Sequence, residues 1–167
     1  MAILKTLRDN LIDLELDRVW KGLDQTEELA RSDLDELKRR TLRELTDLLC
    51  RAGCVGNANK LWTDLCNRER KASTAVGMGI AFPHIRTMQV TQFVAGIARS
   101  ARGIPFDAPD GQPVHLFFVM AAPPYDDKSY LRAYKALATA LRYDTVRRAL
   151  LGASEPHELV RVLRQSL

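Results

Sequence analysis

The feature that most constrains the fold of this chain is an almost wholly apolar run from Val114 to Ala122. A run of this kind has no polar face to turn toward water, so it predicts a strand buried on both faces of a sheet. Pro123-Pro124 ends the run, because proline supplies no backbone donor for a sheet ladder. Shorter apolar segments at residues 80–82 and 92–98 predict two neighbouring strands.

Helical periodicity flanks these strands in the sequence. Before them, Ser32 has the character of an N-cap, and apolar residues recur at helical spacing until Gly53, a natural stop. A second helix is expected from Asn57 to about Arg70. After the strands we expect helices at residues 129–141 and 145–151, and a last helix with Ser154 as N-cap. This order predicts an α/β fold, a mixed β-sheet flanked by helices.

The N-terminal part of the chain has the least regular pattern. Leu11 to Leu16 alternates apolar and polar residues, which predicts a strand with one face in water. Residues 17–30 are polar and lack a clear period. We therefore divide the chain into residues 1–31, an N-terminal extension whose structure the sequence leaves open, and residues 32–167, the main domain.

Composition narrows the class of protein. A length of 167 residues and a net charge of +4 fit one mildly basic domain. Basic clusters such as Lys38-Arg39-Arg40 are mixed with acidic residues. They therefore form solvated helix faces or contact an acidic partner. No nucleic-acid partner is implied. No apolar run is long enough for membrane insertion. The odd count of Cys50, Cys54 and Cys66 indicates neither a disulfide framework nor a metal site, and favours a cytoplasmic location.

Three histidines are candidate functional residues. His157 falls in the first turn of the last expected helix among acids, which is typical of a surface residue. His115 falls within the central apolar run, where a structural role is the simpler interpretation. His84 follows an apolar segment, and Phe82-Pro83 restricts the backbone just before it. We therefore expect the His84 imidazole to be exposed at the end of a strand.

The residue types around His84 fit phosphoryl transfer. A neutral imidazole is a good nucleophile near neutral pH. Arg86 lies two residues on, and Arg68 ends the preceding expected helix; guanidinium groups bind phosphate oxygens in bidentate fashion. Phosphoryl transfer needs positioning and charge neutralisation more than covalent help from the protein. One histidine near two arginines is a weak pattern, so a structural role for His84 stays open at this point.

A longer pattern resembles a known family. Arg68-Glu69, then Ser73-Thr74, then the glycine-flanked segment from Gly77 to His84 resemble the fructose/mannitol type of enzyme IIA domain of the phosphoenolpyruvate-dependent phosphotransferase system. Further similarities occur at residues 105–108, 110–114, 121–123 and 150–159. The resemblance covers residues 32–167 and implies the mixed sheet with flanking helices. It implies no metal and no other cofactor.

The resemblance also implies roles for individual residues. His84 matches the histidine that accepts a phosphoryl group from the phosphocarrier HPr or its nitrogen-branch relative. Arg68 matches the arginine that stabilises this group, and Thr74 matches the threonine before the active-site loop, which would support the phosphate loop. Arg86, named from its position two residues after His84, would support the same loop. Tyr130 stands where family members usually carry a second active-site histidine. A tyrosine can donate a hydrogen bond there, but it cannot become cationic near neutral pH.

Three functions remain open from the sequence. The preferred interpretation is a regulatory, nitrogen-branch-like protein that binds a regulated transporter or kinase differently when phosphorylated. The first alternative is a sugar-specific IIA component that passes phosphate to a cysteine of a IIB domain. The second is a IIA-fold binding module that accepts no phosphate. The protein is a phosphotransferase, a phosphohistidine phosphocarrier, only in the first two cases.

Overall fold

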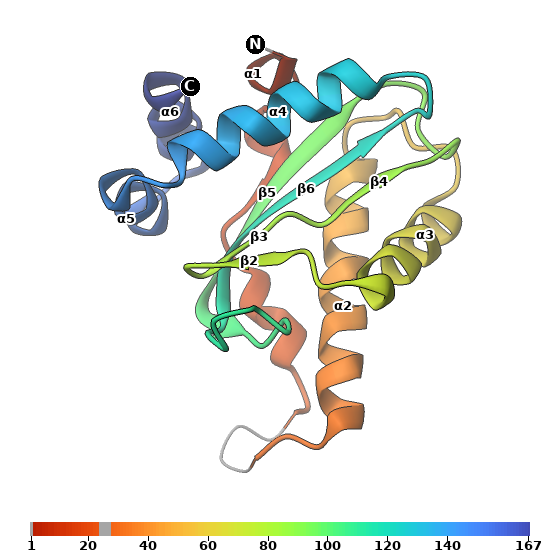
Figure 1. The fold of residues 1–167 in the computed structure, drawn as a ribbon, viewed down its shortest axis with the longest axis vertical. Helices are drawn as coiled ribbons and strands as arrows, with labels where there is room; N and C mark the ends of the chain where they lie inside the picture. The colour runs from red at the N-terminus through yellow and green to blue at the C-terminus, as the bar shows by residue number, and fades with distance from the viewer. Residues whose placement is uncertain (1, 24–27) are drawn as a thin grey trace.

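The computed structural model describes residues 2–23 and 28–167, and they form three layers, with a mixed sheet between two layers of helices (Figure 1). One layer consists of α2 (Arg31–Cys50) and α3 (Ala58–Lys71). The other consists of α1 (Ala2–Thr6), α4 (Asp127–Ala140), α5 (Asp144–Gly152) and α6 (Pro156–Ser166). This arrangement confirms the predicted α/β fold.

The sheet is built around β6 (Val114–Ala122), the apolar run that the sequence singled out. Its residues are buried except for the half-buried His115. β5 (Val94–Ile104) pairs antiparallel with one edge of β6, and β3 (Ile80–Ala81) and β4 (His84–Arg86) pair parallel with the other. β1 (Ile12–Asp13) extends the sheet beyond β5, and β2 (Ala75–Gly77) extends it beyond β3. The prediction of a central strand buried on both faces is confirmed.

β3 and β4 follow β6 as one interrupted strand. Ile80 lies opposite Leu116 and His84 lies opposite Met120, so both segments keep the same register along β6. Pro83 falls in the interruption because it has no N–H for the ladder, although its carbonyl still accepts from the Met120 N–H at 2.9 Å. β3 therefore ends ahead of Pro83, as the apolar segment predicts, but His84 does not lie at the end of that strand: it opens the next one, β4.

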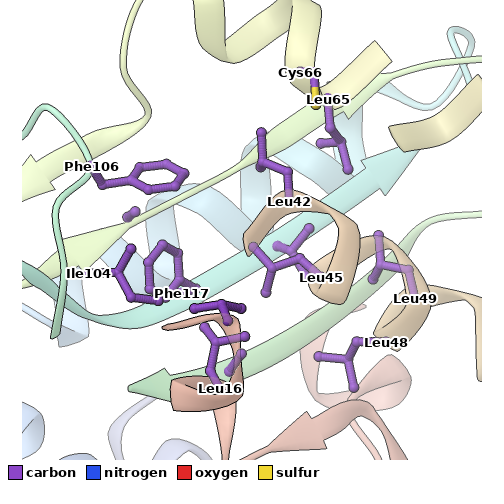
Figure 2. Close-up of a cluster of buried hydrophobic side chains, with 14 of the residues drawn as sticks. Leu16, Leu42, Leu45, Leu48, Leu49, Leu65, Cys66, Ile104, Phe106 and Phe117 are labelled. Atoms are coloured by element: carbon purple, nitrogen blue, oxygen red, sulfur yellow. The ribbon is translucent and has the colours of Figure 1, made fainter. Parts of the chain in front are cut away.

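Two hydrophobic cores flank the sheet. In the first, leucines of α2 and α3 pack against β5 and β6, and Figure 2 shows Leu45 between α2 and the ring of Phe117. The helix comes close to β5 because Gly96 has no side chain: a Cβ there would lie 3.0 Å from Leu48 Cδ2. The second core joins the opposite face of the sheet to α1, α4, α5 and α6. Burial of a leucine such as Leu45 contributes about 1.5–3 kcal/mol.

The N-terminal residues differ from the predicted strand. Only Ile12 and Asp13 form β1, between the 3-10 turns η1 (Asp9–Leu11) and η2 (Leu16–Trp20). Asp13 does not face water but is 8% exposed, because the guanidinium of Arg18 pairs with its carboxylate. β1 pairs in parallel with β5, so residues 12–13 form an edge of the same sheet that carries His84.

The other differences between the predicted and the observed elements concern where helices begin and how long the strands are. Ala30, not Ser32, occupies the N-cap of α2. Glu155, not Ser154, caps α6, because Glu155 and Glu158 form a reciprocal capping box. α4 begins before Ser129, whose N–H donates to the Asp126 side chain. β5 continues to Ile104, past the predicted end at residue 98, through residues too polar to indicate a buried strand.

Candidate active site

Four of the residues named from the sequence line one open pocket of about 740 Å³. Arg68 reaches it from α3, His84 and Arg86 from β4, and Tyr130 from α4. Strand alternation explains part of this arrangement, because His84 and Arg86 are two residues apart and lie on the same face of the sheet. That face is the one covered by α4.

One hydrogen bond fixes the His84 ring. Its Nδ1 lies 2.6 Å from the Phe82 carbonyl oxygen. A carbonyl oxygen only accepts, so Nδ1 carries the proton and donates, and the neutral ring keeps its lone pair on Nε2. The ring is half-buried, not exposed as the sequence predicted. Aromatic side chains of α4 cover part of the ring, which explains its partial burial.

Two tyrosines of α4 shield His84 from water. The Tyr130 ring centroid lies 5.1 Å from that of His84, and Tyr134 lies edge-on at 6.3 Å. Tyr134 also contacts Phe82, with ring centroids 5.0 Å apart. Sequence reasoning missed Tyr134, although its spacing of four residues from Tyr130 places both on one helix face. Burial raises the pKa of the Tyr130 hydroxyl, which therefore stays protonated as a hydrogen-bond donor.

The same surroundings keep the His84 imidazole neutral. Burial lowers its pKa, and although the hydrogen bond to the Phe82 carbonyl acts in the opposite direction, the positive charge of Arg68 lowers it further. Glu69 has a smaller, opposite effect on this pKa. The net direction is downward, so Nε2 is available as a nucleophile at neutral pH.

The two arginines differ in their pairing. Arg68 Nη1 donates to the Ala72 carbonyl at 2.9 Å, which fixes its guanidinium at the end of α3. Within residues 2–23 and 28–167, Arg68 forms no ion pair, so its charge is not compensated. The Arg86 guanidinium pairs with the carboxylate of Asp127 at the start of α4. Arg68 therefore supplies the free positive charge in the pocket, while Arg86 is partly neutralised.

Thr74 lies outside the pocket lining. It is buried, and its N–H and hydroxyl donate to the carboxylate of Glu69 at the end of α3. Its carbonyl accepts from the Phe82 N–H at 3.0 Å. Lys38 compensates the buried Glu69 charge, with an N···O distance of 3.2 Å. Thr74 thus connects α3 to the segment that carries His84, and it does not face the reacting group.

The other histidines lie away from the pocket. His115 Nδ1 lies 2.9 Å from the Ser100 carbonyl oxygen. Its ring packs against Gly103, where an added Cβ would lie 2.9 Å from His115 Cε1. His157 is exposed on α6. Among the residues that the structure describes, no three His, Cys, Asp or Glu side chains are grouped so as to hold a metal ion.

The family can be assigned from the sequence as a whole. The family model for the EIIA 2 component of the phosphoenolpyruvate-dependent sugar phosphotransferase system matches residues 26–166. The chain belongs to this EIIA 2 family. None of the helices within residues 2–23 and 28–167 has both the length and the hydrophobicity needed to span a bilayer.

Relatives of the EIIA 2 chain include both sugar-specific and regulatory proteins. It is 35% identical to the fructose-specific EIIA component of Haloferax volcanii, covering 77% of this chain and 83% of that protein. It is 29% identical to a nitrogen regulatory protein of Pseudomonas aeruginosa, covering 75% and 82%. It spans only 20% of the fructose-specific EIIABC component of Bacillus subtilis, at 31% identity.

Solved structures agree with this assignment. The nitrogen regulatory protein IIA-Ntr from Neisseria meningitidis superposes with a TM-score of 0.79 at 27% identity, over 98% of this chain and 99% of that one. The mannitol IIA protein from Escherichia coli has a TM-score of 0.70 at 19% identity, covering 94% and 98%, and so shows the same fold.

We expect His84 to titrate below the ordinary histidine pKa of about 6.5. The folded pKa lies below the unfolded one, so the native state loses stability as the pH falls from about 6.5 toward the His84 pKa. Tyr130→Ala should expose the ring and move the pKa upward. Ring ¹⁵N NMR titration measures this pKa and also identifies the protonated nitrogen. A pKa at or above the ordinary value, or a proton on Nε2 in the neutral ring, would contradict the site geometry.

Proposed function

We propose that this protein accepts a phosphoryl group on Nε2 of His84 from an HPr-type phosphocarrier and acts as a regulatory protein of the nitrogen-related branch. The observation that carries the proposal is the hydrogen bond between His84 Nδ1 and the Phe82 carbonyl. It occupies one ring nitrogen and leaves the other as the nucleophile. A protein in this role works in the cytoplasm.

The transfer can be written as one balanced step. A bond forms between His84 Nε2 and phosphorus while the bond from phosphorus to the carrier's histidine nitrogen breaks. The carrier ring keeps the electron pair of that broken bond. The His84 ring retains its Nδ1 proton and becomes positively charged, which the Phe82 carbonyl stabilises as the acceptor of that proton's hydrogen bond.

Three side chains support this step. Arg68 supplies the uncompensated charge for the phosphoryl oxygens. Arg86 can add a second guanidinium once it leaves Asp127, its partner in the unphosphorylated pocket. The Tyr130 ring limits water access to His84, and its hydroxyl can donate to a phosphoryl oxygen.

The regulatory role is favoured over sugar transport by Tyr130. A tyrosine cannot take a proton to form a cation as a second histidine can, so rapid onward transfer lacks that assistance. The similarity to IIA-Ntr, which covers nearly the full length of both chains, supports the same role. The similarity to the fructose-specific component of Haloferax volcanii keeps sugar transport as the second candidate, with a IIB cysteine as acceptor.

We expect wild-type protein to gain one phosphoryl group when incubated with phosphoenolpyruvate, enzyme I and HPr of the nitrogen or the sugar branch. His84→Ala should gain none, because it lacks the nucleophile. His157→Ala is the matched control, since it removes an exposed histidine outside the pocket and should leave uptake unchanged. Intact-mass measurement at neutral to alkaline pH gives the result. Uptake by His84→Ala would exclude His84 as the acceptor.

Arg68→Ala should slow phosphoryl transfer about 100-fold, which is typical of losing one charge-stabilising donor. Arg70→Ala removes a neighbouring exposed guanidinium, whose described side-chain partner is Asn67, and should change the rate little. Rapid-quench kinetics with the phosphorylated carrier measures both rates, and circular dichroism confirms folding. Equal rates for Arg68→Ala and wild type would remove Arg68 from the mechanism.

Substitution of Tyr130 separates the two candidate functions. In the regulatory role, phosphorylated wild type keeps its phosphoryl group in the presence of a fructose-type IIB domain, and Tyr130→His speeds its loss. Tyr130→Phe keeps the ring but has no group that can become cationic, so it should not gain the rapid transfer expected of Tyr130→His. Mass analysis of both proteins over time follows the transfer. Rapid transfer from wild type would instead support the sugar-transport role.

A further inference from the structure

The outer face of α4 carries positive charge that the fold does not neutralise. Lys128, Arg132 and Lys135 follow one another at spacings of four and three residues, so they form one stripe on the helix. All three are exposed. They form no ion pair with any residue in the described part of the chain. We call Lys128, Arg132 and Lys135 the basic face of α4.

On α2, by contrast, several basic residues pair with carboxylates of the same helix. There, carboxylates one turn away pair with the arginines: Arg31 with Asp35, Arg40 with Glu36, and Arg43 with Asp47. α4 contains no acidic residue after Asp127, and Asp127 already pairs with Arg86. Like charges one turn apart destabilise a helix slightly. The basic face of α4 therefore has no acidic partner on its own helix.

The basic face adjoins the pocket through an exposed apolar side chain. Leu131 is 60% exposed, lies on α4 beside the stripe, and lines the pocket with His84 and Tyr130. Figure 1 shows α4 along the outside of the molecule, with the sheet on its inner side. An apolar anchor surrounded by charged residues is typical of a protein-binding surface. Any protein that contacts His84 must also pass close to this helix.

We propose that the basic face of α4, with Leu131 as its anchor, docks an acidic surface of a protein partner. Weakening of this complex by phosphorylation of His84 then follows from the proposed function. The first part stands on the charges and exposure of α4. The second part rests on the proposed phosphorylation of His84.

The phosphorylation effect follows from charge. A phosphoryl group adds about −1.5 to −2 charges. His84 touches Tyr130, the residue preceding Leu131, with ring centroids 5.1 Å apart, so the new charge arises close to the docking surface. Exposed charges interact over about 8 Å at physiological salt. The negative group therefore repels an acidic partner.

A protein partner fits better than a nucleic acid. The stripe from Lys128 to Lys135 is only about 10 Å long, at about 1.5 Å of helix per residue, which spans few phosphates of a duplex. A phosphate backbone also offers no apolar group that the exposed Leu131 beside the stripe could contact.

The test uses a fluorescein-labelled, Glu-rich helical peptide with one leucine stripe as the probe, read by fluorescence anisotropy with full-length protein. We expect Arg132→Glu/Lys135→Glu to weaken binding at least about tenfold. Lys21→Glu/Lys60→Glu is the matched control, because it makes the same charge change at exposed residues off α4 and should retain binding. Leu131→Ala should weaken binding several-fold. Amide NMR shifts on adding peptide should map to α4.

The outcomes separate the two parts of the proposal. Equal loss of binding in both double variants, or no shift on α4, would overturn the docking site. Tighter binding of duplex DNA or phosphatidylserine vesicles, with the same dependence on α4, would overturn the protein partner. Phosphorylated wild type should bind the peptide roughly tenfold more weakly, and unchanged affinity would overturn the regulation. Failure of wild type to take up phosphate would refute the proposed function and leave the docking site supported.

Discussion

The site depends on the register of residues 80–86 along β6. Because β6 is buried on both faces, the strand beside it cannot slip by one residue without moving apolar side chains out of a core. The register holds across the break at Pro83, where the carbonyl still accepts from β6. This constraint places His84 under α4 and Ile85 on the opposite face, against the core of α2 and α3.

Phe82 connects this constraint to the chemistry. Its N–H donates to Thr74, its carbonyl accepts from His84 Nδ1, and its ring packs on Tyr134. One residue thereby joins the α3 end, the nucleophile and α4. The orientation of the imidazole follows from backbone that the sheet already holds, so the ring needs no carboxylate partner to select its tautomer.

Charge is distributed unevenly around the pocket. Near the site, Lys38 compensates the buried Glu69, and Arg86 pairs with Asp127. Arg68 and the basic face of α4 are not compensated by the described residues. The first can stabilise an incoming phosphoryl group, and the second can attract an acidic protein surface. Arg68 lines the His84 pocket, and the basic face of α4 adjoins that pocket through Leu131, which is why both point to function.

The sequence by itself determined the apolar central strand, the helical segments around it, and His84 and Arg68 as site candidates, because periodicity and local motifs are encoded over short stretches. Tyr130 became a candidate through the family resemblance. Only the tertiary structure decided that His84 opens a strand, that Thr74 supports the site from outside the pocket, and that Tyr134 shields the imidazole. It also decided which of the many basic residues remain unpaired. These features depend on contacts between segments far apart in the chain, and single-residue patterns carry no information about such distances.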